Sequence, residues 1–218
     1  QLSFGFVDEI AQLYYNDYEA NETTLTKTFD LRYRDEDVRP QIDAIWSKAY
    51  NTIASANSVL DNISGHDFAI LPRIRGEALT VRAFLHFDLL RLFAPNIERG
   101  DEQAIPYVEH FSISPVERST VREVYERIVA DLTEAYGLLR DAQPASGRTP
   151  EELYVSQYAA AALLARVCNW GGDHETAERY ALEALKGPFA FIREEQIKNL
   201  FLGYTARTEC IWGLHAPD

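Results

Sequence analysis

The sequence predicts an all-α fold of stacked helical hairpins, with little β-strand outside the residues near Ile211. Apolar residues recur at steps of three and four between Ile42 and Leu185, which is the repeat of one face of an α-helix. Capping residues and clusters of glycine and proline divide this stretch into helices of ordinary length. The chain of 218 residues is therefore expected to form a single helical domain.

The first long helix is predicted from Ile42 to Ile63. Ser64 and Gly65 follow it, and glycine at this position is typical of a helix end. Residues 1–41 have a different pattern, because aromatic and polar side chains alternate there without a helical period. We expect this segment to be irregular, apart from a short helix near Val7 to Tyr15.

The next helix, predicted from Arg73 to Pro95, is apolar on almost every side and should be buried. Arg82 and His86 nevertheless lie on its apolar side, four residues apart. Because an unpaired guanidinium in a protein interior is very costly, Arg82 should be buried against a carboxylate or backbone carbonyls. His86 is expected to be a hydrogen-bonded core residue.

A third amphipathic helix is predicted after the loop that Pro95 opens. Thr120 and Glu123 have the spacing of a capping box, and apolar residues then share one face up to Leu139. Residues 143–150 combine glycine, proline and serine, so they predict a loop.

A helical hairpin is predicted next, from Glu151 to Trp170 and from His174 to Lys186, across Gly171-Gly172. Its spacing matches a degenerate tetratricopeptide repeat, in which small residues let the two helices approach closely. The residues in the corresponding places are Leu164, Ala165, Cys168, Ala177, Ala181 and Ala184. The helices in residues 42–94, 120–170 and 174–186 would then stack as successive repeats, and residues 187–218 would begin a further part of the fold.

Composition narrows the classes of function. The net charge of -13 argues against binding to a nucleic-acid backbone, which needs clustered cations. No uninterrupted apolar run approaches the roughly 20 residues that span a bilayer. The 46% hydrophobic content is ample for a core.

The sequence contains no recognisable catalytic, metal or cofactor motif. Its five histidines are scattered and none has the spacing of a metal-ligand pair. The adjacent acids Glu151 and Glu152 point apart on a helix, so they cannot act as an opposed glycosidase pair, and they suit a first helical turn instead. We therefore expect no catalytic residues, no metal and no cofactor.

Several segments, in the same order along the chain, resemble proteins of the SusD/RagB family. These segments are Trp46 to Tyr50 with Ile53, Asn57 and Leu60, then Arg73 to Pro95, Val124 to Ile128, Ala159 to Val167, Gly172-Asp173, Tyr180-Ala181 and Glu209 to Trp212. In this resemblance Trp46, Asn57, Arg82 and His86 belong to the structural core.

The resemblance implies a binding protein rather than an enzyme. Family members are surface lipoproteins of the bacterial outer membrane that capture oligosaccharide or another nutrient and pass it to a SusC-like TonB-dependent transporter. Membrane attachment would be through an N-terminal lipid anchor that this chain lacks. Since members are roughly twice as long, the resemblance implies an N-terminal half.

The resemblance also implies that the irregular segment before the first long helix contributes to the glycan site. Aromatic rings can stack on a pyranose, and Asn, Asp and Arg can bind its hydroxyls. The candidate ligand-binding residues, chosen by chemistry and location, are Tyr18, Asn21, Arg32, Tyr33, Arg34 and Asp35. The aromatic members could instead anchor the segment to the core.

Two alternatives stay open at this point. A tetratricopeptide-type adaptor that holds peptides in a concave groove is the second functional hypothesis, although no regular 34-residue repeat is found. Cys168 and Cys210 could form one disulfide, but two buried free thiols are favoured because nothing in the sequence places their Cα atoms close together.

Overall fold

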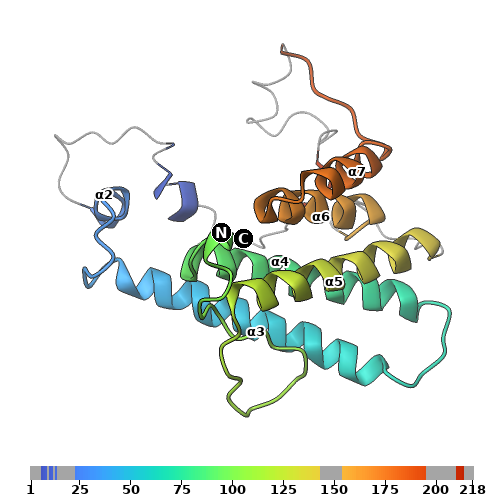
Figure 1. The fold of residues 1–218 in the computed structure, drawn as a ribbon, viewed down its shortest axis with the longest axis horizontal. Helices are drawn as coiled ribbons and strands as arrows, with labels where there is room; N and C mark the ends of the chain where they lie inside the picture. Colours follow the sequence, from blue (N-terminus) through green and yellow to red (C-terminus); the bar gives the residue numbers. More distant parts are fainter. Residues whose placement is uncertain are drawn as a thin grey trace. The chain divides into compact units, whose positions relative to one another are not determined.

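The computed structural model describes residues 6–8, 10–11, 13, 23–142, 154–194 and 210–213 (Figure 1). These residues contain helices and no strand, which confirms the predicted all-α class. The elements are α2 (Thr24–Phe29), α3 (Arg39–Ile63), α4 (Leu71–Phe93), the 3-10 helix η1 (Ile97–Arg99), α5 (Val121–Asp141), α6 (Gln157–Gly171) and α7 (His174–Ala184).

The chain folds into two compact units, one up to Thr52 and one from Ile53 onward, and α3 contributes residues to both. In the first unit, Phe6 to Asp8 and Ile10 are helical, as predicted, but Ala11 and Leu13, which lie inside the predicted helix, are not. Tyr14 and Tyr15, which close the predicted short helix, lie outside the described residues. The expectation of a single domain stays a prediction.

The segment predicted as irregular contains a short helix, α2. Thr23 caps it, because its hydroxyl accepts a hydrogen bond from the Thr26 amide at 3.3 Å while the Thr23 amide donates to the Thr26 hydroxyl at 3.4 Å. Helix α3 also begins earlier than predicted, at Arg39, with Pro40 in its first turn. Proline suits that position because it lacks an amide hydrogen, and amide hydrogens in the first turn of a helix have no intrahelical acceptor.

In the second unit, α4 packs against α5 as a buried helix (Figure 1). The predicted Pro95 boundary is confirmed, since α4 ends at Phe93 and Ala94 is extended. Gly76 lies at the close approach of the two helices, where an added Cβ would be 2.8 Å from the Leu139 side chain and 3.2 Å from the Ala135 carbonyl oxygen. Only a residue without a side chain fits there.

The capping box of α5 is present as predicted. The Thr120 hydroxyl accepts from the Glu123 amide at 3.3 Å, and the Glu123 carboxylate accepts from the Thr120 amide at 2.8 Å. The face predicted to be apolar is buried, through Val121, Val124, Ile128, Leu132, Ala135 and Leu139. A core cluster of Leu60, Ala78, Leu79 and Ala135 joins α3, α4 and α5.

The α6–α7 hairpin is present, but α6 begins at Gln157 rather than at Glu151. The Ser156 side chain caps it by accepting from the Ala159 amide at 3.2 Å, and the described residues just before it, Tyr154 and Val155, are not helical. Glu151 and Glu152 lie outside the described residues. Gly172 has the left-handed φ of 84° that ends a helix, as the predicted Gly-Gly turn requires.

Helix α7 ends at Ala184, two residues before the predicted end. The two cysteines are free, with Cys168 buried and Cys210 half-buried, so the favoured free thiols are confirmed and only the burial of Cys210 is less than expected. No described helix is long and apolar enough to cross a membrane.

The contact at Gly76 predicts opposite effects for two glycine substitutions. Gly76→Ala should lower the free energy of unfolding by about 1–3 kcal/mol, because the new methyl group would force α4 and α5 apart. Gly137→Ala in α5 should raise it by roughly 0.5–1 kcal/mol, since no atom lies within 4 Å of its added Cβ. Denaturant titration measures both, and a stabilised Gly76→Ala variant would contradict the close packing.

Candidate functional site

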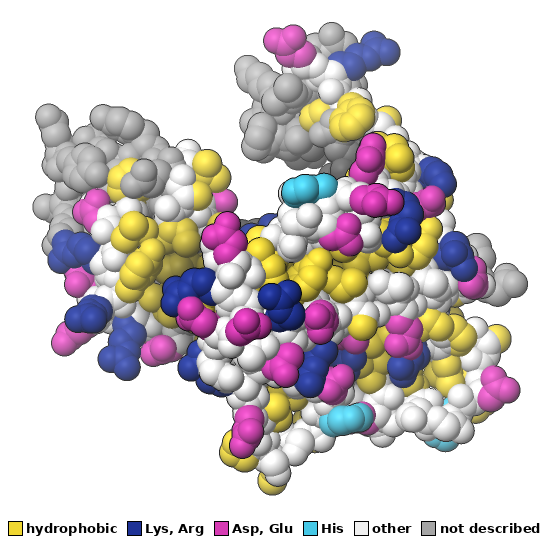
Figure 2. Space-filling model, viewed as in Figure 1, with side chains coloured by type: hydrophobic (Ala, Val, Ile, Leu, Met, Phe, Trp, Pro, Cys, Tyr) yellow, Lys and Arg dark blue, Asp and Glu magenta, His cyan; other side chains and the backbone are white. Residues whose placement is uncertain are grey.

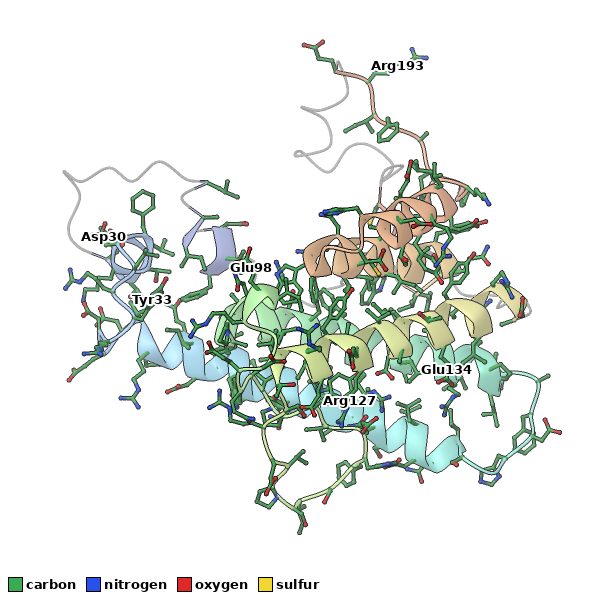
Figure 3. The ribbon with its side chains drawn as sticks, in the orientation of Figure 1. Asp30, Tyr33, Glu98, Arg127, Glu134 and Arg193 are labelled. Carbon is green, nitrogen blue, oxygen red and sulfur yellow. The ribbon has the colours of Figure 1, made fainter. Side chains whose placement is uncertain are left out.

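Four of the predicted ligand-binding residues lie together in the turn that follows α2. Arg32, Tyr33, Arg34 and Asp35 are consecutive there, next to Leu31, whose positive φ of 59° starts the turn. Figure 3 labels Tyr33 in this part of the first unit. Two further predicted residues, Tyr18 and Asn21, lie outside the described residues.

Ion pairs hold this turn in shape. Lys27 of α2 donates to Asp37 at 2.6 Å and lies 3.9 Å from Asp35, while Arg32 is 2.8 Å from the same Asp35 carboxylate oxygen. The hydrogen bond from Lys27 holds the pKa of Asp37 below its ordinary value. Because Arg32 and Asp35 form an ion pair, their charges neutralise each other within the turn.

Tyr33 and Arg34 are the turn residues best placed to meet a ligand. The Tyr33 residue is 46% exposed, and Arg34 is exposed with no ion pair to any described residue. An exposed phenol ring beside a guanidinium can stack on a sugar ring and donate hydrogen bonds to its hydroxyls. The interpretation of Tyr33 as a buried anchor is not supported by this exposure.

The second unit contains a buried polar network centred on Arg82. As predicted, Arg82 is buried, with 7% of its surface exposed, and it is paired with a carboxylate. Its Nε and Nη2 atoms donate to the two Asp131 carboxylate oxygens at 2.6 and 2.7 Å. Its Nη1 atom donates to the Asn57 side-chain oxygen at 3.1 Å and to the Glu109 carbonyl oxygen at 3.0 Å.

The hydroxyl of Tyr107 completes the shell of Asp131. It donates to one Asp131 oxygen at 2.5 Å, and burial together with the charge of Asp131 raises the pKa of Tyr107 far above its ordinary value. The phenol therefore keeps its proton and remains a donor. Arg127 of α5, labelled in Figure 3, lies over the same ring at 5.8 Å.

His86 is a hydrogen-bonded core residue, as predicted, and its partners define its tautomer. The Val108 amide donates to Nε2 at 3.1 Å, so that nitrogen carries no proton, and Nδ1 donates to the Arg82 carbonyl oxygen at 2.9 Å. Burial, reinforced by the charge of Arg82, lowers the pKa of His86 to about 3. The ring stacks on Tyr107 with centroids 4.0 Å apart.

The other two residues predicted to be structural, Asn57 and Trp46, have different surroundings. Asn57 is fully buried in the network, where its side-chain amide also donates to the Val108 carbonyl oxygen at 2.8 Å. Trp46 is half-buried and its ring lies 4.9 Å from that of Tyr50, one turn along α3. We assign Asn57 to the buried network and keep a structural role for Trp46 as a prediction.

Sequence reasoning missed the partner of Arg82. Asp131 lies on the apolar face of α5, between Ile128 and Ala135, and is as buried as Arg82 itself. Arg82 was predicted to be buried because it is a charged residue on an apolar helix face, and Asp131 has the same feature. Considered together, the two positions would have predicted an ion pair between Arg82 and Asp131.

The described residues contain no group of three histidine, cysteine or acidic side chains that could hold a metal ion. The face of the molecule in Figure 2 has acidic and basic side chains interspersed, without a continuous basic patch. On this face, the pattern is unlike the clustered cations of a nucleic-acid interface.

Comparison with known proteins identifies the class to which this fold and surface belong. Residues 7–168 match the model of a SusD-like family described as "Starch-binding associating with outer membrane". A curated relative, SusD-like protein P2 from Formosa agariphila, is 31% identical over 170 residues, which cover 73% of this chain and 30% of the relative. The chain belongs to the SusD-like family.

Solved structures share the fold. A SusD superfamily protein from Bacteroides vulgatus has a TM-score of 0.74 at 22% identity, covering 97% of this chain and 52% of its own. A laminarin-binding SusD-like protein has a TM-score of 0.61 at 18% identity, covering 88% of this chain and 44% of its own. The chain thus spans about half or less of the length of these relatives.

The buried network predicts a large loss of stability on removing Arg82. Arg82→Ala should lower the free energy of unfolding by about 3–5 kcal/mol, because Asp131 would be left buried and unpaired. Arg75→Ala is the matched control, since Arg75 pairs with Glu134 at the surface, where the two side chains are 41% and 45% exposed. Its loss should stay below about 1 kcal/mol. Equal losses in denaturant melts would contradict the burial of the Arg82 pair.

The neutral state of His86 predicts a pH dependence of stability. Its folded pKa of about 3 is below the ordinary 6.5, so the unfolded chain binds the extra proton between these values. The stabilisation is complete above pH 6.5 and is lost as pH falls, by about 2 kcal/mol between pH 7 and pH 5. Denaturant melts across this range measure it. His86→Gln should flatten the curve between pH 7 and 5, and an unchanged curve would show that another group is responsible.

Proposed function

We propose that this chain is part of a surface-exposed outer-membrane protein that captures oligosaccharide or another nutrient and passes it to a SusC-like TonB-dependent transporter. The protein binds without catalysis and is attached to the membrane by an N-terminal lipid. The observation that carries the proposal is membership of the SusD-like family over residues 7–168.

The chemistry of the turn after α2 supports a sugar ligand. Tyr33 supplies an exposed ring, and Arg34 supplies donors that no described carboxylate uses. Lys27 and Arg32 both pair with Asp35, and a turn that is ordered before binding loses less entropy when a ligand binds.

The buried network supports a scaffold rather than an acid–base site. Both ring nitrogens of His86 are engaged, and Asp131 accepts hydrogen bonds from Arg82 and Tyr107. A general acid or base must exchange a proton with a bound substrate. The side chains of His86 and Asp131 are instead hydrogen-bonded to other groups of the protein.

Removing the Tyr33 ring should weaken glycan binding without unfolding the protein. Tyr33→Ala in the complete protein should raise the Kd for an oligosaccharide about five-fold, because a stacked aromatic is worth about 1 kcal/mol. A glycan array first identifies the oligosaccharide, and calorimetry then measures the Kd.

Leu25→Ala is the matched control, because Leu25 is also exposed but lies in α2 rather than in the turn. It should leave the Kd unchanged. If Tyr33→Ala leaves binding untouched and lowers the melting temperature by many degrees, Tyr33 is a structural anchor and the turn is not the binding surface.

A further inference from the structure

A second cluster of arginine and aromatic side chains lies between α4 and α6, within the second unit. Arg91 of α4 lies over the buried Phe87 ring, with its Cζ atom 5.1 Å from the centroid, and Arg166 of α6 lies 5.9 Å from the same centroid. The Trp170 ring meets Phe87 edge-on at 5.8 Å. Two guanidinium groups therefore share one aromatic ring.

The positive charge of this cluster is only partly neutralised. Asp88 accepts a hydrogen bond from Nη2 of Arg91 at 2.5 Å, but Arg166 has no ion pair within the described part of the chain. The Nε atom of Arg91 is buried and has no hydrogen-bond partner among the described residues. Arg166 is an exposed residue, but partial desolvation of its guanidinium and the charge of Arg91 lower its pKa, and the charge of Asp88 opposes them. Two cations thus face one anion.

Two other arginines that stack on rings in the second unit also have a carboxylate partner, whereas Arg179, 5.1 Å from the Tyr180 ring, has no ion pair to a described residue. Arg140 lies 5.8 Å from the Tyr136 ring and pairs with the Asp141 carboxylate at 2.8 Å. Arg127, over Tyr107, pairs with Glu109 at 3.4 Å. Arg166 differs from both because it stacks without a carboxylate, next to a second cation.

We propose that Arg91 and Arg166 bind an oxyanion, the carboxylate or sulfate group of an acidic sugar. The planar fork of a guanidinium matches the paired oxygens of either group. Arg166 and Trp170 are four residues apart on α6 and so share a face, where the half-buried indole lies beside the anion site as a surface for the sugar ring. This inference rests on the proposed function, since it specifies the class of glycan.

Calorimetric titration of the complete protein with sodium glucuronate and with sodium sulfate tests the site. Sodium chloride of equal ionic strength is the reference. The wild-type protein should bind at least one of the two anions, and Arg166→Gln should weaken that binding at least ten-fold. Arg140→Gln is the matched control and should bind like the wild-type protein, because Arg140 already has its carboxylate.

Binding of glucuronate alone assigns a carboxylate, and binding of sulfate alone assigns a sulfate. The proposal is overturned if neither anion binds, or if Arg166→Gln binds as well as the wild-type protein. Failure of both anions with a lower melting temperature of Arg166→Gln would mean that another carboxylate of the protein occupies the site. A neutral oligosaccharide that binds while both anions fail would leave the proposed function intact, and the absence of any glycan binding would sink that function itself.

Discussion

The second unit depends on one buried ion pair, between Arg82 of α4 and Asp131 of α5. The same guanidinium also binds the Asn57 side chain from α3 and the Glu109 carbonyl from the loop that precedes α5. One side chain thus connects four segments of the chain. A charge buried to this extent is tolerated only if every donor has an acceptor, and this requirement selects one arrangement of the four segments.

His86 extends this constraint to the loop. Its neutral ring accepts from the Val108 amide, while the base of the loop is closed by the hydrogen bond between Ala104 and Ser119, at 2.8 Å. In this part of the interior, each hydrogen-bond donor of the network is therefore matched to a particular acceptor. A binding protein benefits from such a scaffold, because ligand contacts can vary on surface turns such as the one at Tyr33 without disturbing the core.

Much of this architecture follows from the sequence. Apolar periodicity located the long helices, and the position of Arg82 on an apolar face predicted its burial. Helix α2 was missed because six residues are too few to show a period, and the start of α6 was missed because the Ser156 cap outweighed the acidic first turn expected at Glu151.

Chemistry placed Tyr33 and Arg34 among the candidates, but only the structure shows that Asp35 neutralises Arg32. Arg91 and Arg166 meet at the Phe87 ring only because α4 packs on α6. A local sequence pattern cannot show such a contact between two helices.

Amide hydrogen exchange at Val108 tests the central role of the network most directly. The Val108 amide donates to His86 inside the network, whereas the Phe111 amide, three residues on, donates to the exposed carboxylate of Asp61 at 2.8 Å. If the network holds the loop, the Val108 amide should exchange only through global unfolding, and the Phe111 amide should exchange through much smaller openings. Similar fast exchange at both amides would contradict the account.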